Sequence, residues 1–224
     1  MKATDFRWPF LIVLGGVILL GNLAEPASLG ITSDWSDGRY RFAGGTAPWA
    51  LGSSVVILVL YFWLMVTPSA SALNPLPGII RRWLAFWIDF VLAIMMVTPI
   101  LGVIPCIREW RRTGIFEWSF ERTSSAPGDG WVTAVTFLLS LTAILAYWAY
   151  PLMRGTPSPG SCVLGYQIAP ADERPMTVQR AFLRTLVGFV AVCTPYLAPF
   201  IKRNRKRGQF WLDEVFGTYA VQLK

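Results

Sequence analysis

The chain has 224 residues and a mean hydropathy of +0.48, with 54% hydrophobic and 14% aromatic residues. A water-soluble fold of this size could not bury so much apolar surface, so the composition excludes an ordinary soluble domain and indicates a membrane protein. The net charge of +7 fits basic loops that face the cytoplasm and anionic lipid better than it fits nucleic-acid binding.

Four stretches are apolar over the roughly 20 residues that a membrane helix needs. They are residues 8–24, 48–67, 83–105 and 131–153. The first could also be a secretory signal, but the "NLAEPA" that follows has no clear small-residue cleavage site, so we expect a retained helix. Residues 1–77 are therefore predicted to form an N-terminal domain, a hairpin of two helices with an extracytoplasmic loop.

Two polar segments separate these stretches. In residues 25–47, "SDGR" lies between "DW" and "YRF" and predicts a β-hairpin centred on Asp37 and Gly38. Residues 106–130 mix arginines, acids and aromatic residues before a Pro-Gly break, a pattern that favours a short helix at the membrane surface.

A fifth apolar stretch, residues 181–201, either spans the membrane or enters and returns. Pro195 and Pro199 interrupt it, and a re-entrant path leaves both termini and most of the basic residues on the cytoplasmic side. We therefore expect four spans and a broken fifth segment. Five spans in the reversed orientation remain the alternative.

The stretch "RRWLAFWIDF" places Asp89 inside an apolar run. Arg82 lies two helical turns earlier on the same face, roughly 10 Å away along the axis, too far for a tight pair. An ionised carboxylate at this depth is costly, so we expect Asp89 to face the bundle interior and to accept hydrogen bonds from an arginine. The candidates are Arg180 and Arg184, one turn apart at the start of the fifth stretch.

Two shorter patterns follow. The alternation in "VLGYQI", residues 163–168, favours a strand or an interfacial segment. In residues 211–221, Asp213 and Glu214 begin a short apolar stretch with Gly217 as its stop, which predicts a helix lying on the membrane. The fold class predicted from these elements is all-α: a polytopic membrane protein with four transmembrane helices, a broken or re-entrant fifth segment and a short C-terminal interfacial helix.

Four motifs in this order resemble the RDD family of bacterial and archaeal membrane proteins, which is named for an Arg, Asp, Asp set. They are Arg82, Ala85, Ile88 and Asp89; Ser158, Pro159, Gly160, Ser161 and Gly165; Arg180 to Arg184 in "RAFLR"; and Leu212, Asp213, Gly217 and Thr218. The resemblance covers about residues 78–222, so residues 78–224 are taken as an RDD-like membrane domain. Two positions depart from the pattern, because Ser161 replaces the usual lysine and Glu214 a usually apolar residue.

The resemblance implies a bacterial inner-membrane protein whose relatives are generally taken to act in transport. It groups Arg82, Asp89 and Asp213 as one charge set, with supporting residues Arg180, Arg184, Gly160, Gly165, Gly217 and Thr218. In a transporter, Asp89 would be a protonatable or cation-binding carboxylate beside a broken helix. Under a purely structural interpretation, the same charges hold the bundle together.

A third possibility is an accessory or protective membrane protein that binds a partner through its extracytoplasmic loops. The partners expected are the lipid bilayer, a second copy of the chain or another membrane protein, and no nucleic acid. The chain has no histidine and its three cysteines are far apart, so we expect no disulfide framework, no metal and no cofactor. Without a recognisable nucleophile and base, we also expect no enzymatic activity.

Overall fold

The computed structural model describes nine parts of the chain. They are residues 9, 11–17, 30–36, 39–66, 71–72, 79–123, 126–171, 176–193 and 211–223. The chain divides into two compact units. Unit 1 comprises Met1–Leu11, Tyr61–Val91 and Leu145–Lys224, and unit 2 comprises Ile12–Leu60 and Leu92–Ile144.

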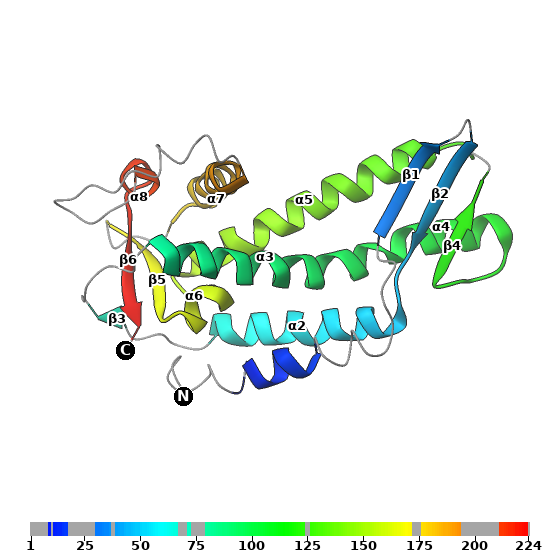
Figure 1. The fold of residues 1–224 in the computed structure, drawn as a ribbon. Coiled ribbons are helices and arrows are strands. Elements are labelled where there is room, and N and C mark those ends of the chain that lie inside the picture. The colour runs from blue at the N-terminus through cyan, green and yellow to red at the C-terminus, as the bar shows by residue number, and fades with distance from the viewer. Residues whose placement is uncertain are drawn as a thin grey trace. The chain divides into compact units, whose positions relative to one another are not determined.

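Three long apolar helices contribute residues to both units (Figure 1). They are α2 (Pro48–Val66), α3 (Ile79–Leu101) and α5 (Asp129–Arg154). In the part of the chain that is described, three segments are long and apolar enough to cross a membrane: Pro48–Met65, Ile80–Thr113 and Asp129–Arg154. The chain is therefore a multi-pass membrane protein.

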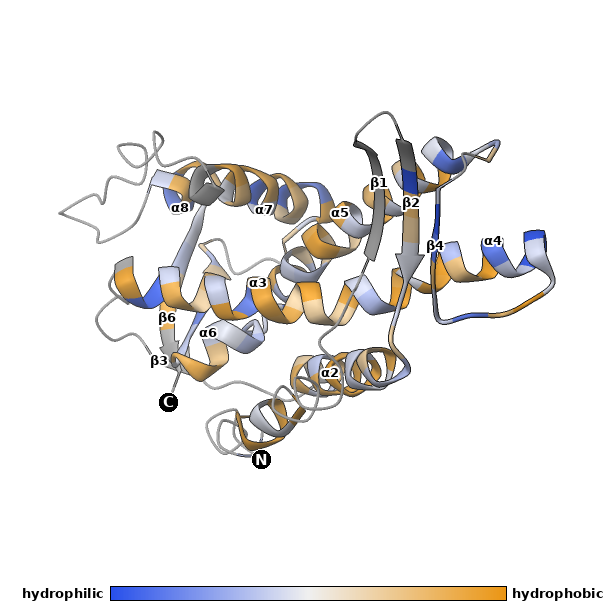
Figure 2. Ribbon diagram, turned by 45° about the vertical axis from the view of Figure 1, so that its right-hand side comes forward, coloured by the Kyte–Doolittle hydropathy of each residue, from blue (hydrophilic) through white to orange (hydrophobic). Residues whose placement is uncertain are grey.

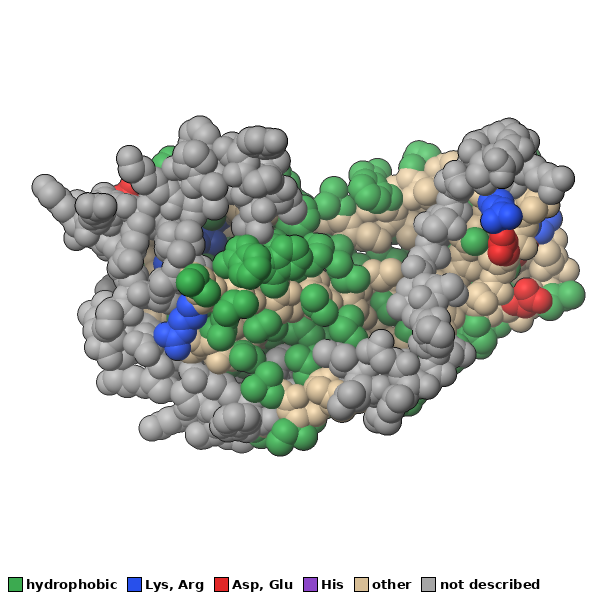
Figure 3. Space-filling model, in the orientation of Figure 1, with side chains coloured by type: hydrophobic (Ala, Val, Ile, Leu, Met, Phe, Trp, Pro, Cys, Tyr) green, Lys and Arg blue, Asp and Glu red, His purple; other side chains and the backbone are tan. Residues whose placement is uncertain are grey.

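The surfaces of these helices suit lipid. Figure 2 shows that α2, α3 and α5 are apolar along most of their length, and Figure 3 shows hydrophobic side chains gathered over α3. Large apolar side chains such as Val59, Phe137 and Trp131 are exposed, as expected where hydrocarbon rather than water surrounds a helix.

Unit 2 carries a three-stranded antiparallel sheet in the order β1-β2-β4. Strands β1 (Gly30–Ser36) and β2 (Arg39–Gly45) pair from Gly30↔Gly45 to Ser36↔Arg39, and β4 (Ser119–Arg122) pairs with β2. The hairpin predicted from "SDGR" is confirmed, although residues 37 and 38 lie outside the described residues. The helix predicted in residues 106–130 is α4 (Val103–Thr113), which ends at the left-handed Gly114.

Unit 1 carries the second antiparallel sheet, in the order β3-β6-β5. Its strands are β3 (Ser71–Ala72), β5 (Tyr166–Pro170) and β6 (Thr218–Leu223). Three helices belong to the same unit: α6 (Pro159–Val163), α7 (Val178–Cys193) and α8 (Trp211–Val215). Of the two alternatives for "VLGYQI", a strand or an interfacial segment, the structure shows the strand, β5.

The all-α prediction is wrong in one respect, because this mostly helical chain contains two three-stranded sheets. The helix predicted for residues 211–221 ends at Val215, and Gly217, at φ +52°, turns the chain into β6. There the strand "TYAVQL" pairs with β5 from Thr218↔Pro170 to Gln222↔Tyr166. Strand pairing satisfies backbone groups that a short surface helix would leave to water.

Two other predictions fall partly outside the described residues. Of the first predicted span, 8–24, only residues 9 and 11–17 are described, and of the stretch 181–201 only the part to Cys193, where α7 ends. The span at residues 8–24, and with it the count of four, therefore stays a prediction. The re-entrant path and the domain boundary between residues 77 and 78 stay predictions as well.

Candidate functional site

Asp89 is buried inside α3 and is held by donors that carry no charge. Its Oδ1 accepts hydrogen bonds from the Gly160 backbone N–H (2.7 Å) and the Tyr147 hydroxyl (2.9 Å), and its Oδ2 accepts from the Ser158 hydroxyl (2.6 Å). Only 2% of Asp89 is exposed, so these three donors replace its water shell.

The first turn of α6 brings two of these donors to Asp89. Ser158 is the N-cap residue and Pro159 follows it, so the chain enters the helix with a free backbone N–H at Gly160. A Cβ at Gly160 would collide with the carbonyl oxygen of Ala85 and would lie 2.9 Å from Asp89 Cγ. Glycine is therefore needed for α6 to approach α3 this closely.

The arginines bind the other acid of the set. Asp213 is fully buried, and its Oδ2 accepts from Arg82 Nη1 (2.5 Å) while its Oδ1 accepts from Arg184 Nη2 (2.8 Å). The Arg184 Nε also donates to the Thr218 hydroxyl (3.1 Å). The prediction that an arginine holds Asp89 is thus wrong. The seven-residue spacing separates Arg82 from Asp89 along α3, and Arg82 instead reaches Asp213 on α8.

The surroundings of Asp213 set its protonation. Burial raises the pKa of this carboxyl, but the guanidinium groups of Arg82 and Arg184 lower it by more, so its pKa lies below the ordinary aspartate value. Asp213 is therefore a carboxylate at neutral pH, and it clamps α3 and α7 to the segment that carries α8.

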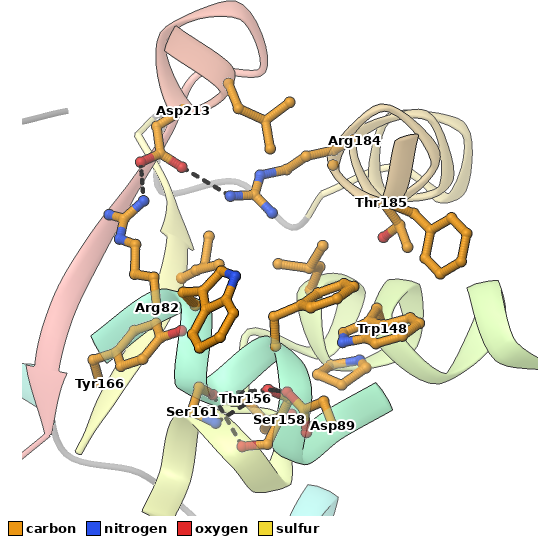
Figure 4. A pocket seen from close by; sticks show the side chains of 18 of the residues that line it. Arg82, Asp89, Trp148, Thr156, Ser158, Ser161, Tyr166, Arg184, Thr185 and Asp213 are labelled. Atoms are coloured by element: carbon orange, nitrogen blue, oxygen red, sulfur yellow. Dashed lines mark hydrogen bonds and ion pairs between the residues drawn. The ribbon is translucent and has the colours of Figure 1, made fainter. Parts of the chain in front are cut away.

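The Asp89 and Asp213 clusters line one cavity of about 270 Å³ within unit 1. Figure 4 shows Asp89 with Ser158 and Ser161 at one end of the lining side chains, and Asp213 with Arg82 and Arg184 at the other. The rest of the lining is mostly apolar and includes the aromatic rings of Trp83, Phe86, Trp148 and Phe189. The site is a mostly apolar cavity with charged groups at its two ends. Small-molecule sites are typically apolar cavities with a few polar groups of this kind.

One family model matches the part of the chain that forms this site. The model of the RDD family matches residues 76–216, more than half of the chain. The chain belongs to the RDD family. No curated protein and no solved structure matches it.

In this RDD protein the three residues of the charge set, Arg82, Asp89 and Asp213, do not form one cluster. Arg82 and Asp213 pair directly, while Asp89 lies apart from them with its own neutral donors. The RDD residues thus serve two neighbouring sites on the same cavity wall.

Of the supporting residues predicted for the RDD domain, Gly160 contacts Asp89, and the others lie around the Asp213 cluster or at turns. Arg180 donates through Nε to the Phe216 carbonyl (2.8 Å) and through Nη2 to the Gly217 carbonyl (3.1 Å). Gly165, at φ +71°, joins α6 to β5 in a backbone conformation that favours glycine.

Sequence reasoning missed Tyr147 and Thr185 in this RDD protein. Tyr147 is buried in α5, and Thr185 lines the cavity from α7. A tyrosine within the apolar run "ILAYWAY" was the available signal, because a buried hydroxyl needs a partner. For Thr185 no comparable signal exists.

A buried ion-pair cluster in unit 2 was also missed. Asp129, at the start of α5, accepts from Arg108 Nη1 (2.6 Å), from Arg122 Nη2 and from the Ala126 backbone N–H (2.8 Å). The signal was "SAPGDG", where an acid after a turn precedes a long apolar run. Among the described residues, no group of three or more His, Cys, Asp and Glu is placed to hold a metal ion.

Proposed function

We propose that this RDD protein is a non-enzymatic, transport-related membrane protein in which Asp89 receives a proton or a cation at the cavity. One observation carries the proposal: a buried carboxylate in a membrane-length helix borders a cavity and has only neutral donors among the described residues. The Asp213 cluster, in contrast, pairs its acid with two arginines and supports a role in holding the wall together.

The charge of Asp89 gives the physical reason. Hydroxyl and N–H donors solvate a carboxylate but leave its full negative charge in a medium of low polarity. A proton or a cation that reaches this oxygen pair from the cavity removes that charge. Loading and unloading of Asp89 is therefore the step that we assign to transport.

The proposed topology has four spans, beginning with residues 8–24, and a re-entrant fifth segment at 181–201. Both termini lie in the cytoplasm of a bacterial cell, in its inner membrane. Basic residues at the start of α3 and at the end of α5 support this orientation, because positive charge gathers on the cytoplasmic side.

A flux assay on purified protein in liposomes tests the role of Asp89. A potassium gradient with valinomycin imposes a membrane potential, and a trapped pH-sensitive dye records proton movement. We expect wild type to move protons at least tenfold faster than empty liposomes and Asp89→Asn to fall to their level. The matched control is Glu117→Gln, which removes an exposed acid.

The melting temperature of each variant separates transport from stability. If Asp89→Asn keeps the wild-type flux, or if wild type is no faster than empty liposomes, the proposal fails. If expression, melting temperature and flux fall together in Asp89→Asn, Asp89 is a structural residue instead.

A second candidate function is an accessory protein that binds a partner in the membrane. The observation that favours it is an exposed aromatic cluster in unit 2: Trp110 packs edge-on against Phe116 (6.3 Å between centroids), and Phe116 against Trp118 (5.0 Å). Aromatic side chains are enriched at the centre of protein interfaces.

Cross-linking and capture from native membranes tests this alternative. Replacing Trp110, Phe116 and Trp118 with serine is expected to remove one specific membrane protein from the captured set, while Trp131→Ser, another exposed tryptophan, keeps it. An unchanged captured set contradicts the accessory role.

A further inference from the structure

The cavity has an uncompensated negative charge at one end. Among the described residues, every hydrogen-bond donor to Asp89 is neutral, whereas Asp213 at the other end binds two guanidinium groups. A cationic group that entered the cavity would be attracted to the Asp89 end and not to the arginine end.

The wall next to Asp89 suits an organic cation. The rings of Phe86 and Trp148 stack with their centroids 5.3 Å apart, and Phe189 lies 6.1 Å from Trp148 and 6.3 Å from Phe86. All three rings line the cavity. Aromatic faces attract alkylated ammonium groups, which are weakly hydrated and need no directional ligand.

A bare metal cation suits this end of the cavity less well. Hard cations take about six oxygen ligands, yet Asp89 already accepts hydrogen bonds from Tyr147, Ser158 and Gly160, and each of them presents a hydrogen to the carboxylate. A cavity of about 270 Å³ is also far larger than one ion requires and approaches the usual size of a small-molecule pocket.

A second polar anchor lies across the cavity on α7. Thr185 is only 6% exposed and lines the cavity, and its hydroxyl has no hydrogen-bond partner in the described part of the chain. Figure 4 shows the Thr185 hydroxyl directed toward the side chains that line the cavity. Buried hydroxyls are rarely left unbonded, so this group points to a hydrogen-bonding atom on a ligand.

We infer that the cavity binds a small organic ammonium ion with an apolar body. The cationic nitrogen lies beside Asp89, the body lies against Phe86, Trp148 and Phe189, and a polar group at the far end bonds to the Thr185 hydroxyl. This inference rests on the proposed function and names the substrate class of the same site.

Thermal unfolding of the full chain in detergent tests the inference with a matched pair of probes. Benzoylcholine carries a trimethylammonium group, a ring and an ester carbonyl, and 3,3-dimethylbutyl benzoate has the same shape without the charge. A ligand at free concentration L that binds only the folded state stabilises it by RT ln(1 + L/Kd) and so raises the melting temperature. We expect benzoylcholine to raise the melting temperature of wild type, and neither the neutral ester nor sodium chloride at the same concentration to do so.

Two isosteric variants separate binding from folding. Thr185→Val removes the unbonded hydroxyl, so we expect the affinity for benzoylcholine to fall at least fivefold with no loss of melting temperature in its absence. Thr136→Val is the control, since Thr136 is equally buried and unbonded but does not line the cavity. Asp89→Asn is expected to abolish the response to the charged probe.

The inference is overturned if the neutral ester stabilises wild type as much as benzoylcholine does, if sodium alone gives the same shift, or if neither probe binds. These results leave the proposed function open, because proton flux is measured without any ammonium ion. Conversely, ammonium binding without Asp89-dependent flux overturns transport and keeps the ligand class.

Discussion

Two buried aspartates lie on the same cavity and are stabilised by different donors. Neutral groups hold Asp89 and two arginines hold Asp213, so the charge of Asp89 remains available to a cation while that of Asp213 does not. The same residue type therefore has a binding role at one position and a clamping role at the other.

Gly160 allows α6 to reach Asp89, and its replacement tests that contact. Gly160→Ala is expected to lower the free energy of unfolding by roughly 1–3 kcal/mol, because its methyl group collides with the backbone of Ala85. Thermal unfolding in detergent measures the change. Gly130→Ala is the control: a Cβ there meets nothing within 4 Å, and alanine favours a helix, so stability should stay equal or rise.

The Asp213 cluster makes stability depend on pH in a known direction. The folded protein lowers the pKa of Asp213, so the ion pairs stabilise it above the ordinary aspartate pKa near 3.9, and that stability is lost as the pH falls through the lower folded-state value. We expect the melting temperature of wild type to fall more steeply below about pH 4 than that of Asp213→Asn. Equal slopes for the two proteins would show that Asp213 is not ion-paired.

Residue spacing predicted part of this site. It placed Arg82 and Asp89 on one face of α3 and identified Asp89 as buried, because helical geometry and the cost of a charge among apolar residues follow from sequence alone. It assigned the arginines to the wrong acid, because the level at which α8 meets α3 depends on the turn at Gly217 and on strand pairing.

At the scale of elements, β6 is the central strand of the sheet in unit 1, between β3 and β5. It continues from α8 through Gly217, so the position of Asp213 depends on the pairing of β6 with β5. The local pattern "VLGYQI" predicted β5, but its partner lies some fifty residues later, and no local pattern in the sequence indicates such a pairing.

The junction of α7 with this segment is tested by a conservative change. Arg184→Lys removes the guanidinium group that donates to both Asp213 and Thr218. We therefore expect the free energy of unfolding to fall by about 1–3 kcal/mol and the chain after α7 to be cut sooner by protease. Arg154→Lys, at an exposed arginine, should change neither. Equal protease resistance in both variants would contradict the role of Arg184.

For the whole molecule, apolar length and composition predicted the three described membrane helices closely. Residues 48–67, 83–105 and 131–153 correspond to α2, α3 and α5. Such agreement is expected, because a segment that crosses the bilayer must form its backbone hydrogen bonds within itself over a fixed thickness. The sheets were harder to predict, since only β1 and β2 are close together in sequence.

The orientation in the membrane is tested by two reporter fusions. Green fluorescent protein after residue 224 should fluoresce and alkaline phosphatase inserted after Gly114 should be active, because the proposed four spans place the terminus inside and the turn after α4 outside. Inactive phosphatase at Gly114 would support the reversed five-span orientation. A dark fluorescent fusion with active phosphatase would indicate five spans with the N-terminus inside.

The order of the residues in the Asp213 cluster also bears on biosynthesis. Asp213 follows Arg184 by 29 positions and Arg82 by 131, so both cations are synthesised before their common counter-ion. During insertion the two guanidinium groups must bind lipid phosphates or water. The helices leave the translocon before Asp213 has joined the wall of the cavity. Quality-control proteases then meet an immature form that still lacks α8 and β6, the segment that carries Asp213 and the central strand of the unit 1 sheet.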